Sequence, residues 1–423
     1  MDFILFIIGL ITFFKKKIDW AVFIGIVLST NIFSLAPVMF FPFQHDMKDV
    51  GAFLFIIFIV LYKKIYLQTI YKSNINKYIL CFGIFVVITM LYDYAFNIRA
   101  ISHIILTSRT FIFIFLGLFI VVLSNNQIKS VIKKIIILNF ILLILSYLQY
   151  KGFVSILRFD MEKFKSAGQD FFGFYPPSSL SFSAILLLSL DLFNSKFRTS
   201  MLITCIIGIF LTVIRSYIIA LGIAFIFIFY SKGLSNIKSL AILLLFGLFS
   251  YGIFSSVDQL SNRFNDIDET TKKKGSLAVR SRVTENSIDE LGTSPVKSLI
   301  GVGWKYVDSR NLSSFNNKVD EALSTPDVAW PVLFLRLGYI GTLILILIYL
   351  KIAITAYKNK NNMMSIALLA FLIVLFITSF TSSVIVNSSN FLLIYLLFFY
   401  VEKLSNINIQ NDEAENFSNN FTI

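Results

Sequence analysis

The 423-residue sequence contains few of the residues that most often build catalytic or metal centres. It has only two cysteines and two histidines. Cys81 and Cys205 lie inside apolar runs, which excludes a disulfide framework or a thiolate metal site. His45 and His103 lie far from the long polar segment near the C-terminal third, so neither a Ser–His nucleophile pair nor a His-based metal site can be assembled there. The sequence therefore predicts no metal and no other cofactor.

Charged residues are also scarce, at 14% of the chain, whereas 57% of the residues are hydrophobic. The net charge of +13 comes from lysines and arginines at short junctions between apolar runs. A nucleic-acid-binding protein would gather such charges on one soluble domain. The observed pattern predicts instead a protein oriented against an anionic lipid bilayer, with no nucleic-acid partner.

Apolar runs recur along nearly the whole chain, each about long enough to cross a bilayer core, which takes about 20 helical residues. Because backbone groups in lipid must pair internally, these runs predict helices. The expected fold class is an all-α polytopic integral membrane protein with about 12–13 transmembrane helices. The predicted spans are 2–14, 18–34, 50–63, 78–95, 104–124, 132–149, 179–195, 199–214, 216–231, 237–255, 331–352, 363–383 and 388–402.

Lysines gather at every second junction, as at Lys15–Lys17, and the positive-inside rule assigns those junctions to the cytoplasmic side. The intervening loops therefore face outward. The predicted parts are ten spans with a smaller outward loop at 151–178 (residues 1–254), a large outward-facing loop (255–330), three further spans (331–403) and a disordered cytoplasmic tail (404–423).

The loop at 255–330 is the one long interval without a hydrophobic run, and it holds nearly half of the 24 carboxylates of the chain. Val279, Val283 and Leu291 recur there at helical spacing and predict a helix over 279–291. Lipid-facing helices carry few polar side chains that could act in catalysis. We therefore expect the catalytic work of the protein in this loop.

Two arginines of this predicted helix, Arg280 and Arg282, are separated only by a serine. A guanidinium matches phosphate oxygens and stays charged, so the pair suits an anionic substrate. Arg282 and Glu285 would share one helix face. The alternative for Glu285 is an exposed ion pair with no role in function. A turn of small residues follows at Gly301–Gly303.

Residues 199–231 are too many for one straight span and barely enough for two. Arg215 lies in the middle, where two short helices meeting in a tight turn would place it at the outer mouth of the bundle. An arginine at the bilayer centre costs about 2.5–3.5 kcal/mol, which favours a functional role. The alternative is an arginine that extends to the interface.

The order and spacing of these elements resemble the bacterial O-antigen polymerase and O-antigen ligase superfamily. Thr212–Ser216 is similar to the arginine motif that this family carries on a short apolar hairpin, although the serine follows the arginine and the glycine is missing. Arg282 stands nineteen residues before Gly301, as the loop arginine of the family stands before its Gly-x-Gly. Gly338–Gly341 is similar to the start of its next transmembrane helix.

Counting back from Gly338, the histidine position of the family falls on Asp327, and its usual acidic position falls on Arg336. Ligases of the family depend on that histidine, so its replacement favours a polymerase. For Asp327 the alternative is a helix N-cap before the next span. The loop at 151–178, which contains Arg158, is similar to the smaller outward loop of the family.

The resemblance implies a metal-independent membrane glycosyltransferase of the GT-C type in the bacterial inner membrane. Its substrates would be oligosaccharide repeat units linked to undecaprenyl diphosphate, joined by block transfer with inversion. The implied catalytic residues are Arg215, Arg282 and Asp327, and the implied substrate-binding residues are Arg280, Glu285, Arg336, Arg158, Gly301 and Gly303.

Two other functions stay open. The first is a ligase that transfers the finished glycan to a lipid or protein acceptor. The second is a flippase for lipid-linked oligosaccharides, although flippases show internal repeats and charges lining a midplane cavity, and this chain shows no obvious repeat. A chain-length regulator and a flippase of the same pathway are the expected protein partners of a polymerase.

Overall fold

A computed structural model describes residues 2–30, 47–71, 73–97, 100–150, 153, 177–211, 214–232, 276–304, 329–381 and 388–419. Within these ranges the secondary structure is helical, without a strand. The helices are α1 (Asp2–Phe14), α2 (Ile18–Thr30), α3 (Met47–Leu61), α4 (Lys63–Ile70), α5 (Asn76–Phe96), α6 (Ile101–Leu116), the 3₁₀ helix η1 (Gly117–Val122), α7 (Asn125–Tyr150), α8 (Pro177–Ser189), α9 (Ser195–Leu211), α10 (Arg215–Ser231), α14 (Ser276–Gly292), α15 (Pro295–Ile300), α17 (Ala329–Lys358), α18 (Met363–Ser379) and α19 (Ser388–Asn419).

Each predicted span that the structure describes overlaps one of these helices. The span predicted at 2–14 is α1, for example, and the span predicted at 388–402 begins α19. The span predicted at 237–255 lies outside the described residues. The local rule that apolar runs form helices is therefore confirmed wherever it can be checked.

Among the described residues, three helices are long and apolar enough to cross a membrane by length and composition: α5, Asn125–Leu148 within α7, and α17. The pair α3 and α4 is bent by 90° and adds a fourth candidate if it forms one span. Six shorter apolar helices have 10–17 residues. The described residues thus fit an all-α membrane protein, while the expected total of about 12–13 spans stays a prediction.

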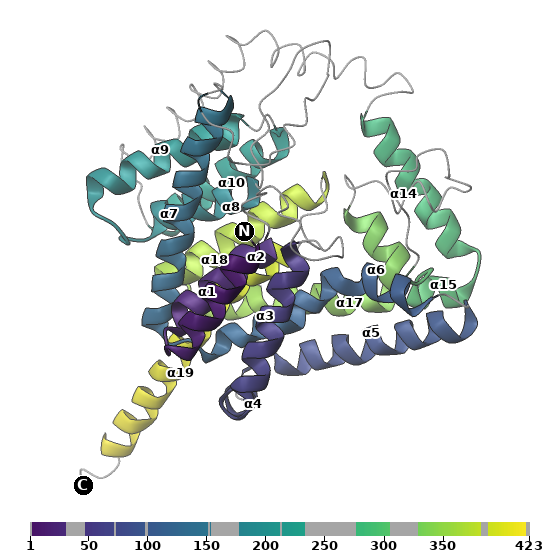
Figure 1. Cartoon of the computed structure of the whole chain (residues 1–423), viewed down its shortest axis with the longest axis horizontal. Helices are drawn as coiled ribbons and strands as arrows, with labels where there is room; N and C mark the ends of the chain where they lie inside the picture. The colour runs from purple at the N-terminus through teal and green to yellow at the C-terminus, as the bar shows by residue number, and fades with distance from the viewer. Residues whose placement is uncertain are drawn as a thin grey trace.

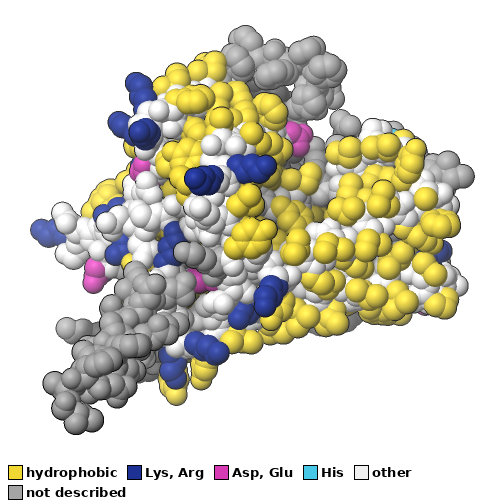
Figure 2. Space-filling view, turned by 90° about the horizontal axis from the view of Figure 1, so that it is seen from below, with side chains coloured by type: hydrophobic (Ala, Val, Ile, Leu, Met, Phe, Trp, Pro, Cys, Tyr) yellow, Lys and Arg dark blue, Asp and Glu magenta, His cyan; other side chains and the backbone are white. Residues whose placement is uncertain are grey.

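The long helices expose large hydrophobic side chains, as a surface in contact with lipid requires. Leu80 and Leu91 of α5 are each about 60% exposed, and Leu343 of α17 is 56% exposed. Figure 2 shows hydrophobic side chains spread over much of the face that it presents, with lysines and arginines gathered mainly on its left half. A hydrocarbon environment removes the cost that this surface would have in water.

The centre of the fold is the first half of α19. Every side chain from Phe391 to Val401 is buried, as expected for a helix that is apolar on all sides. The hydroxyl of Tyr395 donates a 3.0 Å hydrogen bond to the carbonyl of Ile114 in α6. Helices from both ends of the sequence, including α2, α6, η1, α7 and α18, pack around this core.

The C-terminal tail differs from the expectation. We predicted a disordered end after residue 403, but α19 continues as a helix to Asn419. The sequence from 388 to 419 contains no proline or glycine, so nothing in it interrupts the backbone hydrogen bonds of a helix. The polar composition of the tail therefore misled the prediction.

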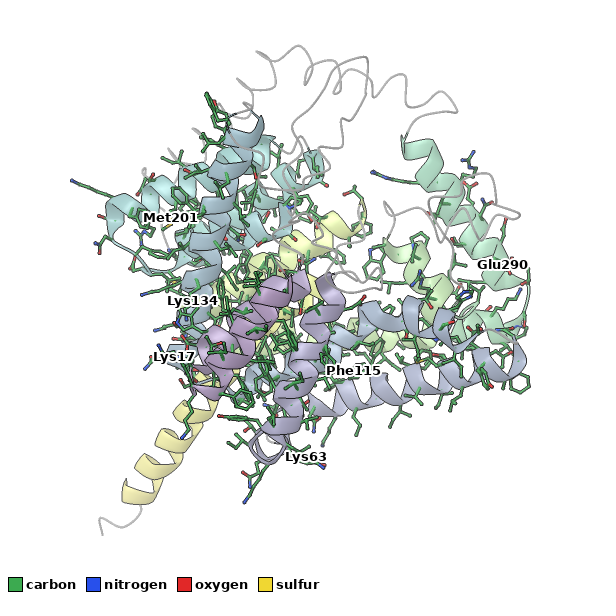
Figure 3. All side chains as sticks on the ribbon, viewed as in Figure 1. Lys17, Lys63, Phe115, Lys134, Met201 and Glu290 are labelled. Atoms are coloured by element: carbon green, nitrogen blue, oxygen red, sulfur yellow. The ribbon has the colours of Figure 1, made fainter. Side chains whose placement is uncertain are left out.

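The lysine-rich junctions approach one another as the alternating topology requires. Ser73 Oγ, between α4 and α5, donates a 2.8 Å hydrogen bond to Glu402 near the middle of α19. Lys134 of α7 forms an ion pair with Asp19, two residues beyond Lys17, and Figure 3 shows both lysines on one flank of the molecule. Which membrane face this flank meets stays a prediction.

The polar segment packs beside α17. Helices α14 and α15 both contact α17, and α17 in turn contacts α5 (Figure 1). The helix predicted at 279–291 is confirmed as part of α14. Figure 3 shows Glu290 of α14 on the opposite side of the view from Lys17 and Lys134. This arrangement positions the candidate site on α14, α15 and the first turns of α17.

Candidate functional site

The two faces of α14 have different surroundings. Val283 and Leu291 are buried in a small core that also contains Val302 and Leu335. Arg282, Glu285 and Asp289 are exposed, so they share one face as predicted. The hydroxyl of Ser281 donates a 3.1 Å hydrogen bond to Glu285 Oε1.

Arg280 points in another direction than Arg282, because two residues along a helix correspond to a rotation of about 200°. Arg280 is partly buried, one turn before the buried Val283. Its Nε is buried and has no hydrogen-bond partner among the residues that the structure describes. The two loop arginines therefore do not converge on one point through the same helix face.

The turn at Gly301–Gly303 is a packing joint with α17. Gly301 and Gly303 have φ angles of +84° and +83°, a region that side chains other than glycine rarely adopt. The Val302 amide donates a 2.6 Å hydrogen bond to the carbonyl of Leu335. This bond satisfies a carbonyl at the end of the first part of α17, because Gly338 (φ +61°) breaks the helix there.

Gly301 and Gly338 meet backbone to backbone. A Cβ at Gly301 would lie 2.5 Å from the Leu335 carbonyl oxygen. A Cβ at Gly338 would lie 2.4 Å from the Leu299 carbonyl oxygen and 2.5 Å from the Gly301 nitrogen. Side chains cannot fit on either side of this contact. The substrate-binding role that we predicted for Gly301 and Gly303 stays a prediction. The positive φ angles of both residues explain why glycine occupies these positions.

Trp304 closes the turn by inserting into the helix bundle. Its side chain is fully buried, and its ring contacts Phe111 of α6 edge-on at a centroid distance of 5.6 Å. Its backbone amide donates a 2.9 Å hydrogen bond to the Asp93 carboxylate of α5. Its carbonyl accepts a 3.0 Å hydrogen bond from the Thr107 hydroxyl of α6. The polar loop is thereby attached to two membrane helices.

Arg336 belongs to the same cluster. Its Nη1 donates a 3.0 Å hydrogen bond to the backbone carbonyl of Thr107. Its Nε is buried and, within the described parts of the chain, unpaired. The structure therefore brings Arg336, Gly301 and Gly303 together, three of the residues predicted to bind substrate.

Arg215 is the first residue of α10, after α9 ends at Leu211. The expected pair of short helices is thus confirmed, and Arg215 begins the second of them; the link at 212–213 and the Arg215 side chain lie outside the described residues. The start of a helix presents unpaired amide groups that favour an anion. Asp327 and Arg158 lie outside the described residues.

Sequence reasoning missed Asp93, Thr107 and Trp304. A signal was available for Asp93, because it is a carboxylate inside the predicted span at 78–95, and such residues are rare in membrane helices without a role. Thr107 and Trp304 carry no comparable signal. Their importance depends on a contact between segments that are about 200 residues apart.

No group of three or more His, Cys, Asp or Glu side chains in the described ranges could hold a metal ion. Positive groups and backbone amides are the available means to stabilise negative charge in these ranges. That the reaction needs no metal stays a prediction.

No curated protein matches the chain. Residues 200–346 match the family model described as O-antigen ligase. The matched segment runs from α9 into α17 and includes Arg215, α14, the Gly301–Trp304 turn and Arg336. This match supports a place for the chain in the superfamily of O-antigen ligases and polymerases, which are glycosyltransferase-like membrane enzymes.

Proposed function

We propose that this protein is a polysaccharide polymerase that joins oligosaccharide repeat units carried on undecaprenyl diphosphate. The observation that carries the proposal is the family match over 200–346, which contains the start of α10 at Arg215 and the arginines of α14. The product would be O-antigen, capsule or exopolysaccharide, and the site would face the periplasm or cell exterior.

The proposed reaction is an inverting glycosyl transfer. A sugar hydroxyl of the acceptor unit attacks the anomeric carbon of the growing glycan. The bond from that carbon to the diphosphate oxygen breaks, and undecaprenyl diphosphate leaves with the bonding electrons. In this proposal Asp327 takes the hydroxyl proton as general base. Arg215 and Arg282 stabilise the negative charge of the leaving diphosphate.

Electrostatic stabilisation is the main task in this reaction. One well-placed positive group at a developing negative charge contributes about 3–4 kcal/mol, or about 100- to 1000-fold in rate. The exposed position of Arg282 and the position of Arg215 at a helix start both support such a role. Arg280, Glu285, Arg336, Arg158, Gly301 and Gly303 would complete the binding site.

The replacement of the family histidine by Asp327 favours a polymerase over a ligase, and the family match fits both. Purified protein in lipid nanodiscs should convert an undecaprenyl-diphosphate-linked repeat unit into a ladder of longer glycans. Transfer to a lipid A core acceptor without a ladder would identify a ligase. Transport of the lipid-linked substrate across vesicles without any new glycosidic bond would identify a flippase.

A further inference from the structure

The strongest feature that the proposed function does not yet use is the buried carboxylate of Asp93. Asp93 lies near the end of α5 and is fully buried. A carboxylate inside a membrane helix is expensive unless it has partners, and it marks a functional position by default. Asn97 Nδ2 donates a 2.6 Å hydrogen bond to Oδ1 of Asp93, and the Trp304 amide donates to Oδ2.

One partner of the Asp93 carboxylate, the Trp304 amide, is a backbone group of the polar loop. On its other side, the Trp304 carbonyl lies 3.0 Å from the Thr107 hydroxyl, whose one proton is shared between this carbonyl and the His103 and Ile104 carbonyls of α6. The indole Nε1 adds a 3.3 Å hydrogen bond to Thr89 of α5. The position of the turn is therefore fixed by α5 and α6 together.

This attachment continues to a candidate substrate-binding residue. Thr107 contacts both the turn and Arg336. Its hydroxyl donates to the Trp304 carbonyl, and its backbone carbonyl accepts a hydrogen bond from Arg336. A continuous path of hydrogen bonds thus joins the Asp93 carboxylate, Trp304, Thr107 and the Arg336 guanidinium. The same turn leads back through α15 to α14 and its arginines.

We propose that Asp93 is a positioning residue for the glycosyl transfer. Its carboxylate holds the Gly301–Trp304 turn against α5 and α6, and this docking fixes Arg336 and α14 relative to the membrane bundle. Asp93 itself does not touch the substrate. The role rests on the proposed function, because it concerns the geometry of that site.

The docking can be measured without any activity assay. A cysteine at Val302, which is buried in the turn, reports whether the turn is docked. The measurement uses Val302→Cys in a Cys81→Ser background, with the full chain in nanodiscs and a water-soluble maleimide. Asp93→Ala should raise the labelling rate of this cysteine about 10-fold or more, because the Trp304 amide loses its acceptor.

Glycan formation supplies the second measurement. Asp93→Ala should lower kcat about 10-fold or more and change KM for the lipid-linked donor less than about threefold, because misplacement of the site weakens the transition state more than substrate binding. Asp93→Asn retains an acceptor for the Trp304 amide. It should stay within about threefold of the parent in both labelling rate and kcat.

A second pair of variants covers the case in which Asp93→Ala does not accumulate. Thr107→Val removes the hydroxyl, which lies within hydrogen-bond distance of the Trp304 carbonyl and of the His103 and Ile104 carbonyls of its own helix. Thr107→Ser keeps this hydroxyl. Thr107→Val should reproduce the faster labelling and the lower kcat, and Thr107→Ser should not.

Two results would overturn the proposal: unchanged labelling in Asp93→Ala and Thr107→Val, or faster labelling with unchanged kcat. A parent protein that labels slowly but forms no glycan from any lipid-linked donor would contradict the proposed function instead.

Discussion

At the scale of single residues, Arg280 and Arg282 show how strongly helix geometry separates neighbouring side chains. One serine lies between them, yet Arg282 is exposed and Arg280 lies partly buried next to the face that packs on α17. Their substitutions should therefore have different consequences. The exposed arginine is accessible to a substrate, whereas the partly buried one also contributes to packing.

We expect Arg282→Ala to lower polymer formation about 100-fold while the amount of protein in the membrane stays unchanged. Arg280→Ala should lower polymer formation less and should also lower the melting temperature in detergent. Asp289→Asn, on the same exposed face as Arg282, is the matched control and should keep full activity. Near-normal polymer from Arg282→Ala would remove this residue from the site.

At the scale of elements, α15 and α17 depend on a contact that only glycine permits. The break in α17 at Gly338 leaves carbonyl groups without helical partners, and the Val302 amide satisfies one of them. The break and the turn of the loop are thus parts of one joint. Each requires the other, because each glycine faces backbone atoms of the other segment.

Gly301→Ala and Gly338→Ala should each destabilise the protein by more than about 2 kcal/mol, since an alanine would be strained at these φ angles and would also clash with backbone. Gly292→Ala is the control, because a Cβ there would meet no atom within 4 Å. Fluorescence-detected size-exclusion after heating should show early loss of the folded peak for the first two variants only. Equal stability of all three variants would contradict the close backbone contact between Gly301 and Gly338.

At the scale of the whole molecule, the contacts are consistent with the alternating topology. Glu402 of α19 bonds to the α4–α5 junction, and Lys134 pairs with Asp19 near the α1–α2 junction. These junctions carry the lysines that the positive-inside rule assigns to the cytoplasm. The Asp93–Trp304 contact occurs near the opposite end of α5. The polar loop should therefore face outward.

Enzyme fusions test this topology directly. An alkaline phosphatase fused after Asn311 should be active, because that enzyme needs the environment outside the cytoplasm to form its disulfides. A fusion after Asn361, between α17 and α18, should be inactive. The reverse pattern would overturn the topology and the location of the site with it.

The whole enzyme should also work without a divalent metal. Purified protein in excess chelator should extend lipid-linked glycan at the same rate as untreated protein, because in the proposed mechanism arginines, and not a metal ion, stabilise the leaving diphosphate. Activity that disappears with chelator and returns with magnesium or manganese would show that arginines alone are insufficient.

Sequence patterns alone were enough to predict the apolar helices, the helix over 279–291 and the two short helices on either side of 212–214. Those features depend on hydrogen bonds and periodicity within one segment, which a single sequence displays directly. It did not determine that Trp304 docks on Asp93, that Gly301 faces Gly338, or that Arg336 bonds to α6. These contacts join residues far apart in the chain, such as Asp93 and Trp304 with a sequence separation of 211, so they become visible only when the chain is folded.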